Sequence, residues 1–335
     1  MSQITRTRRS TAVAVSAFGA AAAIGALAVV SPWPSALAIR ALFERDARRT
    51  RRRLDEFAPD HGLMERYEVS YGEAPELRLN WFCPEEALGA LPVVVWIHGG
   101  AWISGYKEDV DPYLRMIASQ GYTAVSLDYS KAPEEKYPTA LKQLNEALAF
   151  LSANATEFNI DPGRFVLAGD SAGAQLAAQL ATLSTSPIYA KQLDITAGLA
   201  KDQLAALVLH CGIFDVSDIP NSPRIAGWGS RAALWSYLGD RDWSKTPGAS
   251  QMSVINHVTK DFPTSFISGG NGDALTESQS LPFADRLTEL GVAVTTHFPS
   301  DDAHELPHEY QFHMEYAESP KALAAAIHFL DRVTV

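Results

Sequence analysis

The sequence predicts one α/β domain, built on a mostly parallel central sheet with helices on both faces and a cap element. Beyond residue 60, short β-rich runs alternate with longer stretches that have helical spacing. Many of the short runs are apolar throughout, which is typical of parallel strands buried on both faces. With 335 residues, 47% of them hydrophobic, the chain has enough apolar material for a large core, which excludes a wholly disordered protein.

The expected elements follow one another in a regular order. Residues 65–71 and 76–82 are expected to open the sheet, and the fully apolar run 91–97 follows as the next strand. The other strands are expected at residues 122–128, 164–168, 204–211, 263–268 and 293–298. Helices are expected at residues 35–57, 111–120, 137–159, 172–184, 281–290 and 320–333. Strands joined by helices in this way predict a doubly wound sheet in a single domain.

One long segment interrupts the alternation. Residues 212–262 combine aromatic and charged residues with clear turn residues, and the segment is too long for a plain connection. We expect it to contribute, together with residues 35–60, to a cap over one edge of the sheet. The expected organisation is an N-terminal segment, residues 1–34, followed by the α/β domain, residues 35–335.

The N-terminal segment is expected to anchor the chain in a membrane through a single helix. Residues 10–39 carry no charge, and residues 11–30 are almost entirely small and apolar. Twenty helical residues span about 30 Å, the thickness of a bilayer core. Arginines precede the run, as they do in a secretory signal or a signal anchor. Secretion after cleavage at the A-x-A-like site, residues 36–38, is the alternative.

The charge of the chain is unevenly distributed. The formal net charge is −11, but residues 1–53 carry +8 and the remainder carries −19. An acidic body argues against a nucleic-acid partner, because phosphate binding needs a basic face. The arginine-rich run 48–53 is expected to be a solvated face, and contact with anionic lipid headgroups is the alternative if a membrane lies nearby. The two cysteines, Cys83 and Cys211, exclude a disulfide scaffold and a zinc cluster built on cysteines.

The strongest chemical signal is Gly169-Asp170-Ser171-Ala172-Gly173, which has the form G-x-S-x-G. It lies directly between an expected strand and an expected helix. A serine on such a tight turn is held in a strained backbone, and the flanking glycines let sheet and helix approach closely. Its hydroxyl is exposed at the helix N-terminus, where backbone N–H groups favour developing negative charge. Ser171 is therefore the expected nucleophile.

A second signal, His98-Gly99-Gly100-Ala101-Trp102, follows the strand expected at residues 91–97. Two consecutive glycines leave backbone amides bare, so that they can approach a ligand closely. We expect the N–H groups of Gly99, Gly100 and Ala172 to form an oxyanion hole for a tetrahedral intermediate. His98 is expected to brace this loop.

Together these motifs resemble the hormone-sensitive-lipase-like branch of the α/β-hydrolase esterases. Asp128-Tyr129, Ala132-Pro133-Glu134 and Tyr137-Pro138 resemble the loop that leads into the next helix in that branch, and the resemblance covers roughly residues 60–333. It implies the α/β-hydrolase fold, a Ser-Asp-His triad under a cap, carboxylesterase or lipase activity, and no metal or organic cofactor. The chain departs from the family at Ala101, where many members have a third glycine.

The acid and the base of the triad must follow the serine in that order. Asp273 lies in a glycine-rich turn at the end of the strand expected at 263–268 and resembles the acid of the family. Two histidines, His304 and His308, follow the last strand, and one of them should be the base. The distance to the last helix, a preceding proline and two following aromatic residues favour His308.

The sequence thus predicts a serine carboxylesterase or lipase, which acts on a small-molecule or lipid ester through Ser171, Asp273 and His308 and an acyl-enzyme. Aromatic residues suggest an apolar acyl or aryl pocket: Trp102, Phe214, Trp228, Trp235 and Tyr237. The alternatives are a deacetylase of amides or acetylated sugars with the same triad, and a catalytically silent binding protein on a hydrolase fold. No cofactor, metal or nucleic acid is expected, and membrane association is expected through residues 11–30.

Overall fold

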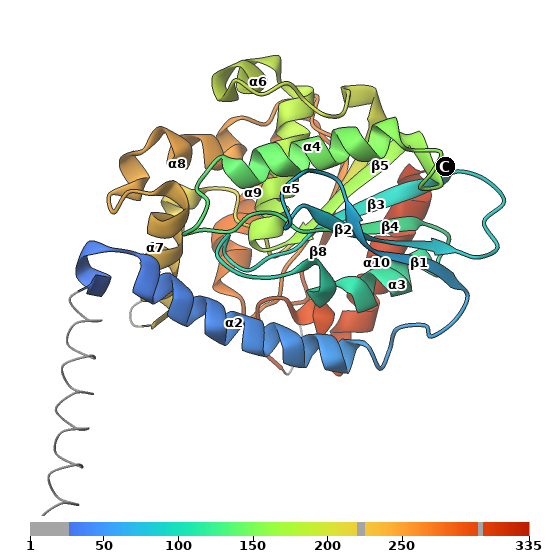
Figure 1. Ribbon diagram of the computed structural model, residues 1–335, viewed down its shortest axis with the longest axis horizontal. Coiled ribbons are helices and arrows are strands. Elements are labelled where there is room, and N and C mark those ends of the chain that lie inside the picture. Colours follow the sequence, from blue (N-terminus) through green and yellow to red (C-terminus); the bar gives the residue numbers. More distant parts are fainter. Residues whose placement is uncertain (1–26, 220–224, 301–303, 335) are drawn as a thin grey trace, which may run out of the picture.

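The computed structural model describes residues 27–219, 225–300 and 304–334, which are organised around one eight-stranded sheet (Figure 1). The strand order is β1-β2-β4-β3-β5-β6-β7-β8; β1 pairs with β2, and β2 with β4, in antiparallel fashion, whereas all other neighbours are parallel. The strands are β1 Leu63–Ser70, β2 Arg78–Pro84, β3 Leu91–Ile97, β4 Thr123–Leu127, β5 Ile160–Asp170, β6 Leu204–His210, β7 Ser265–Ser268 and β8 Val294–His297. The predicted α/β class with a mostly parallel sheet is confirmed.

Helices cover both faces of the sheet. They are α2 Trp33–Leu54, α3 Asp111–Ala118, α4 Thr139–Ala153, α5 Ala172–Thr185, α6 Pro187–Leu193, α7 Ile225–Leu238, α8 Pro247–Met252, α9 Leu281–Glu289 and α10 Glu318–Val333. In β3, Val93 and Val95 pack into a core with α4 and α5, whereas Val94 and Trp96 pack into a second core with α3 and α10. Figure 1 shows these two helix pairs on opposite sides of the sheet. Both side-chain sets of the strand are buried, which explains why its sequence is apolar throughout.

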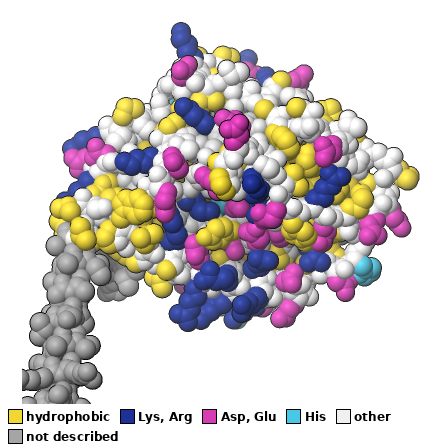
Figure 2. Space-filling view, viewed as in Figure 1, with side chains coloured by type: hydrophobic (Ala, Val, Ile, Leu, Met, Phe, Trp, Pro, Cys, Tyr) yellow, Lys and Arg dark blue, Asp and Glu magenta, His cyan; other side chains and the backbone are white. Residues whose placement is uncertain are grey.

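Helix α2 lies along one edge of the molecule and packs against α7 (Figure 1). Ala36 and Ile39 are buried in the main core, so the helix is part of the body. Its C-terminal half carries the arginine run 48–53, whose arginines are exposed, as expected for a solvated face. Figure 2 shows the basic side chains gathered along this edge, above which acidic side chains are scattered.

The predicted membrane location is wrong. No helix in the part of the chain that the structure describes is both long and apolar enough to cross a membrane. The longest helix near the N-terminus, α2, is instead rich in arginine and packed on the body. The expected anchor comprised residues 11–30, and residues 11–26 of it lie outside the part of the chain that the structure describes. The expected membrane contact through these residues lies outside it as well.

Candidate active site

Strand register brings the chemical motifs to one edge of the sheet. Ile97 at the end of β3 pairs with Gly169 in β5, and Asp170 pairs with His210 at the end of β6. His210 in turn pairs with Ser268, the last residue of β7. These strands are parallel, so the loops that follow them begin side by side. The residues predicted to act together are thus brought close although as many as 209 positions, from Gly99 to His308, separate them in the chain.

Ser171 occupies the turn between β5 and α5. Its φ of 51° and ψ of −119° are in a region that L-residues rarely adopt, and its N–H donates to the carbonyl oxygen of His210. A Cβ atom on Gly173 would overlap the carbonyl oxygen of Ile97, so only glycine fits there. The strained turn and the close contact between β3 and α5 hold the hydroxyl in a fixed position.

Ser171, His308 and Asp273 form a hydrogen-bonded chain. The Ser171 Oγ atom lies 3.0 Å from His308 Nε2, and His308 Nδ1 lies 2.7 Å from Asp273 Oδ2. This geometry fits a tautomer in which Nδ1–H donates to the carboxylate and Nε2 accepts from the hydroxyl. The other carboxylate oxygen of Asp273 accepts from the N–H of Leu275, which fixes the carboxylate. The arrangement has the nucleophile–base–orienter order required for acyl transfer.

The loops of the acid and the base are tied together. The Asn271 side chain accepts from the N–H of Leu306 at 2.7 Å, and the N–H of Gly272 donates to the carbonyl oxygen of Leu306 at 3.0 Å. The structure brings His308 and not His304 to the serine, since His304 is exposed at the outer end of this loop. Phe312, behind the loop, packs against Trp96 of the core.

The pKa of His308 lies well above its usual value. Burial by itself would lower this pKa, but the neighbouring Cys211, the hydrogen bond to Asp273 and the charge of Glu309 together raise it. Glu309 Oε1 lies 3.7 Å from His308 Nε2. The site therefore stabilises the imidazolium, the state that a general base reaches once it has taken a proton.

The loop after β3 departs from the prediction at Gly99. Its N–H does not point to an open site but donates to Asp170 Oδ2 at 2.8 Å, so Gly99 is not available as an oxyanion donor. Among the contacts between described residues, the N–H groups of Gly100, Ala101 and Ala172 reach no acceptor. Gly100 has a φ of 106° and Ala101 a φ of 53°, and this left-handed backbone turns consecutive N–H groups away from the strand.

Asp170, the second residue of the G-x-S-x-G motif, ties the loop to the sheet. It is almost completely buried, and its Oδ1 accepts from Trp96 Nε1 at 2.8 Å while Oδ2 accepts from Gly99. Burial and the nearby charge of Glu309 raise the pKa of Asp170 well above its usual value. Asp170 thus holds the proposed donor loop against the turn that carries Ser171.

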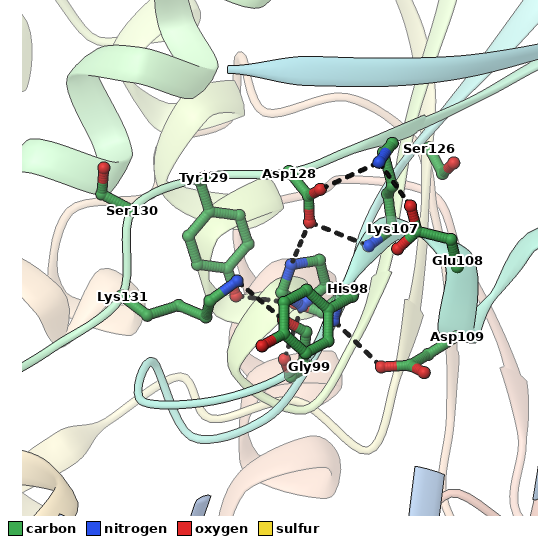
Figure 3. A network of polar contacts seen from close by, with 12 residues as sticks. His98, Gly99, Lys107, Glu108, Asp109, Ser126, Asp128, Tyr129, Ser130 and Lys131 are labelled. Atoms are coloured by element: carbon green, nitrogen blue, oxygen red, sulfur yellow. Dashed lines mark hydrogen bonds and ion pairs between the residues drawn. The ribbon is translucent and has the colours of Figure 1, made fainter. Parts of the chain in front are cut away.

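His98 also braces this loop, and Figure 3 shows it beside Gly99, Asp128 and Tyr129. Its Nδ1 lies 2.8 Å from the carbonyl oxygen of Gly99, its ring stacks on Tyr129 at 4.4 Å, and its Nε2 lies 3.6 Å from Asp128 Oδ1. Asp128 also accepts from the backbone N–H and from the Nζ of Lys107. Burial opposes ionisation of Asp128, but His98 and the nearby lysines lower its pKa to about 2. The carboxylate is therefore charged and anchors the loop.

Arg40 of α2 was not singled out in the sequence, yet it reaches the same region. Its Nε donates to the carbonyl oxygen of Ile103 at 2.5 Å, and its Nη2 donates to that of Ala132 at 2.6 Å. Two guanidinium nitrogens also bind the carboxylate of Glu134. Arg40 thus joins the N-terminal helix to the loops that follow β3 and β4. Sequence pattern could not show this, because Arg40 is one of many arginines in its segment.

Comparison with known proteins identifies the family. The sequence matches the BD-FAE family over residues 79–287, which is more than half of the chain. The chain belongs to the BD-FAE family. The sequence motifs resemble those of the hormone-sensitive-lipase-like α/β-hydrolase esterases, and this prediction of the family is also confirmed.

Two named esterases are similar in sequence to parts of this BD-FAE chain. Esterase LipQ of Mycobacterium tuberculosis is 26% identical over 228 residues, which are 67% of this chain and 52% of LipQ. Carboxylesterase NlhH of the same species is 36% identical over 130 residues, which are 38% of this chain and 40% of NlhH. The chain spans about half the length of the curated relatives it matches first.

Solved structures show the same fold over almost the whole chain. Esterase B from Lactobacillus rhamnosis superposes with a TM-score of 0.76 at 23% identity, covering 90% of this chain and 95% of the other. An esterase from Pyrobaculum calidifontis superposes with a TM-score of 0.71 at 21% identity, covering 90% and 94%. Both likenesses support the α/β-hydrolase fold of this BD-FAE member.

Three residues of the expected aromatic set, Trp102, Phe214 and Tyr237, are buried in this BD-FAE member. Trp102 stacks on Tyr237 of α7 at 5.4 Å, with both rings buried. Phe214 stacks on Phe283 of α9 at 4.0 Å and is also buried. Trp228 is 39% exposed. Some of the aromatic residues expected to line a substrate pocket are therefore packed in the core, whereas Trp228 is at the surface.

One group of potential metal ligands includes part of the site. Among the described residues, ligand atoms of Cys211, Asp273 and His308 lie within 4.8 Å of one another. Cys211 was not singled out as a site residue in the sequence, and only the pairing of β6 with β5 and β7 brings it beside the triad.

Proposed function

We propose that this chain is a serine carboxylesterase that hydrolyses carboxylic esters through Ser171, His308 and Asp273. The observation that carries the proposal is the hydrogen-bonded chain from Ser171 Oγ through the His308 ring to Asp273, with distances of 3.0 and 2.7 Å. It ends beside a loop whose backbone N–H groups are available. The esterase names of the relatives point to the same activity.

The proposed reaction uses these groups in sequence. His308 Nε2 takes the proton of Ser171 as Oγ attacks the ester carbonyl, and Asp273 stabilises the resulting imidazolium. The imidazolium then returns the proton to the leaving alkoxide, so that an acyl-enzyme remains on Oγ. A water molecule, deprotonated by the same nitrogen, attacks the acyl-enzyme and releases the carboxylic acid.

The proposed oxyanion hole consists of the N–H groups of Gly100, Ala101 and Ala172. Ala101 replaces Gly99 of the original expectation, because the Gly99 N–H is bound to Asp170. Ala172 is the first residue of α5, so the helix dipole adds to its effect. Donors fixed in this way stabilise developing charge without reorganising, and each contributes about 10²–10³ to kcat.

We also propose that residues 35–335 form the catalytic domain and that residues 35–60 and 212–262 supply its cap. The contact of α2 with α7 and the stacking of Tyr237 on Trp102 support this assignment. A small-molecule or lipid ester is the proposed substrate. Support for short acyl chains comes from one structural relative, esterase B, which has been solved with a tributyrin phosphonate inhibitor.

The test is hydrolysis of p-nitrophenyl butyrate by purified variants. Ser171→Ala and His308→Ala should each lower kcat by about 10⁴-fold or more, with an unchanged circular dichroism spectrum. His304→Ala is the matched control and should retain wild-type kcat, because His304 lies exposed on the same loop. Wild-type kcat in Ser171→Ala, or a large loss confined to His304→Ala, would refute the proposed triad. A chain that hydrolyses no ester would favour the silent binding protein.

A further inference from the structure

Cys211 is a buried thiol that the proposed reaction does not use. It directly follows β6 (Leu204–His210), its side chain is 1% exposed, and its φ of 42° is unusual for a residue other than glycine. Its N–H donates to the carbonyl oxygen of Ser268 in the neighbouring strand β7 at 2.8 Å. The backbone of Cys211 is thereby tied to β7.

The sulfur lies beside two members of the triad. The ligand atoms of Cys211, Asp273 and His308 lie within 4.8 Å of one another, and His308 Nδ1 lies 2.7 Å from Asp273 Oδ2. Each residue comes from a different part of the chain and sits on a braced loop. Three different donor types therefore converge on one small volume: a thiol sulfur, an imidazole nitrogen and a carboxylate oxygen.

This donor set suits a particular class of cation. Zinc binds sulfur at about 2.3 Å and nitrogen or oxygen at about 2.0–2.2 Å, so tetrahedral ligands are about 3.3–3.7 Å apart. The ligand atoms lie within 4.8 Å of one another, so they would need to shift by about 1 Å to reach that spacing, and His308 Nδ1 and Asp273 Oδ2 would need to move apart from 2.7 Å. Calcium and magnesium instead require six or more oxygen ligands and avoid sulfur. This donor set therefore suits thiophilic divalent cations better than calcium or magnesium.

We propose that Cys211, Asp273 and His308 form an inhibitory binding site for a thiophilic divalent cation of the zinc type. The ion bonds to the Cys211 sulfur, whose proton passes to the solvent, to one oxygen of Asp273 and to Nδ1 of His308, whose proton moves to Nε2. No electrons are transferred. The ion breaks the contact between acid and base and prevents the imidazole from accepting the Ser171 proton. Removal of the ion by a chelator restores the hydrogen-bonded chain.

The binding step is tested without any turnover, so that its outcome is independent of the proposed esterase activity. Cobalt added to the Ser171→Ala chain should produce the near-ultraviolet charge-transfer band of a thiolate–cobalt bond. The band should disappear in Ser171→Ala/Cys211→Ser and persist in Ser171→Ala/Cys83→Ser. Cys83 is the matched control, because it is the other cysteine, is equally buried and lies in β2. Absence of the band, or its loss with Cys83, would overturn the proposal.

A second measurement needs no change at Cys211, in case that change unfolds the chain. Zinc K-edge absorption of the zinc-loaded Cys83→Ser chain should show one sulfur at about 2.3 Å among nitrogen and oxygen ligands. A shell of nitrogen and oxygen alone would refute the site.

Inhibition is the third measurement, and it rests on the proposed function. Zinc should inhibit hydrolysis of p-nitrophenyl butyrate by the wild-type chain, magnesium should not, and EDTA should reverse the effect. In Cys211→Ala the zinc concentration for half-inhibition, relative to the uninhibited rate of that variant, should rise at least about tenfold. Equal inhibition of wild type and Cys211→Ala would contradict the proposal, whereas a chain that is inactive without metal would contradict only the proposed function.

Discussion

Replacing Asp170 by asparagine should loosen the loop that carries the proposed oxyanion donors. The carboxyl group accepts two N–H groups at 2.8 Å, from Trp96 on Oδ1 and from Gly99 on Oδ2. An asparagine offers one oxygen, which can keep the bond to Trp96. Its amide nitrogen can still donate to Glu309, which faces Asp170, but it cannot accept from Gly99.

The size of the effect follows from burial. Asp170 is 3% exposed, so water cannot replace the lost acceptor of Gly99. An unpaired buried N–H costs about 1–3 kcal/mol, and the free energy of unfolding should fall by that amount, with a decrease of a few degrees in Tm. The N–H groups of Gly100 and Ala101 follow directly in the chain. A shift that removes one of them from the oxyanion should lower kcat by about 10²–10³-fold.

The assay is urea unfolding combined with hydrolysis of p-nitrophenyl butyrate. Asp161→Asn is a matched control, since Asp161 also accepts two N–H groups, from Gly163 at 2.9 Å and Arg164 at 2.7 Å, but is half-buried and far from the site. The control should keep wild-type kcat. Wild-type kcat and stability in Asp170→Asn would refute the reasoning, and so would equal losses of kcat in both variants.

Three further outcomes are expected. Arg40→Met should lower the free energy of unfolding by about 1.5–3 kcal/mol and reduce kcat, because it removes the hydrogen bonds to the loops beside the site. As a control, Arg48→Met on the exposed face of the same helix should change the free energy of unfolding by less than about 0.5 kcal/mol. The kcat/KM of the wild type should fall with decreasing pH at a midpoint above 6.5, since His308 must be unprotonated and its pKa is raised. Glu309→Gln removes a charge that raises the pKa of His308, so it should move this midpoint to lower pH. An unchanged midpoint in Glu309→Gln would contradict that cause. EDTA should not reduce hydrolysis, and a loss that added zinc restores would contradict the proposed mechanism.

The regular parts of the fold could be predicted because local sequence and tertiary structure agree in them. The strand expected at residues 91–97 is β3, Leu91–Ile97, and the turn at Ser171 lies between β5 and α5 as its glycines indicated. Helix α6, Pro187–Leu193, was missed. It is only seven residues long, too short for a hydrophobic period to stand out.

Some residues of the candidate site could likewise be predicted from the sequence, and others could not. Ser171, Asp273 and His308 could be named because each follows an expected strand and because the residues around each resemble those of the esterase family. The bond between Gly99 and Asp170 joins residues 71 positions apart, and no local pattern encodes which amide a carboxylate will bind. Arg40 and Cys211 were missed for the same reason. The expected anchor rested on the length and composition of the uncharged run and on the arginines before it, and these features do not distinguish between roles for an alanine-rich segment.

Reaction with a fluorophosphonate probe, followed by peptide mass spectrometry, tests the central claim most directly. The probe phosphorus is attacked only by a nucleophile that an adjacent base activates and that oxyanion donors assist. We predict that one equivalent attaches to Ser171, that hydrolysis of p-nitrophenyl butyrate stops in parallel, and that labelling is absent in Ser171→Ala and His308→Ala. A chain that hydrolyses the ester while Ser171 stays unlabelled, or that carries the probe on another residue, would contradict the account.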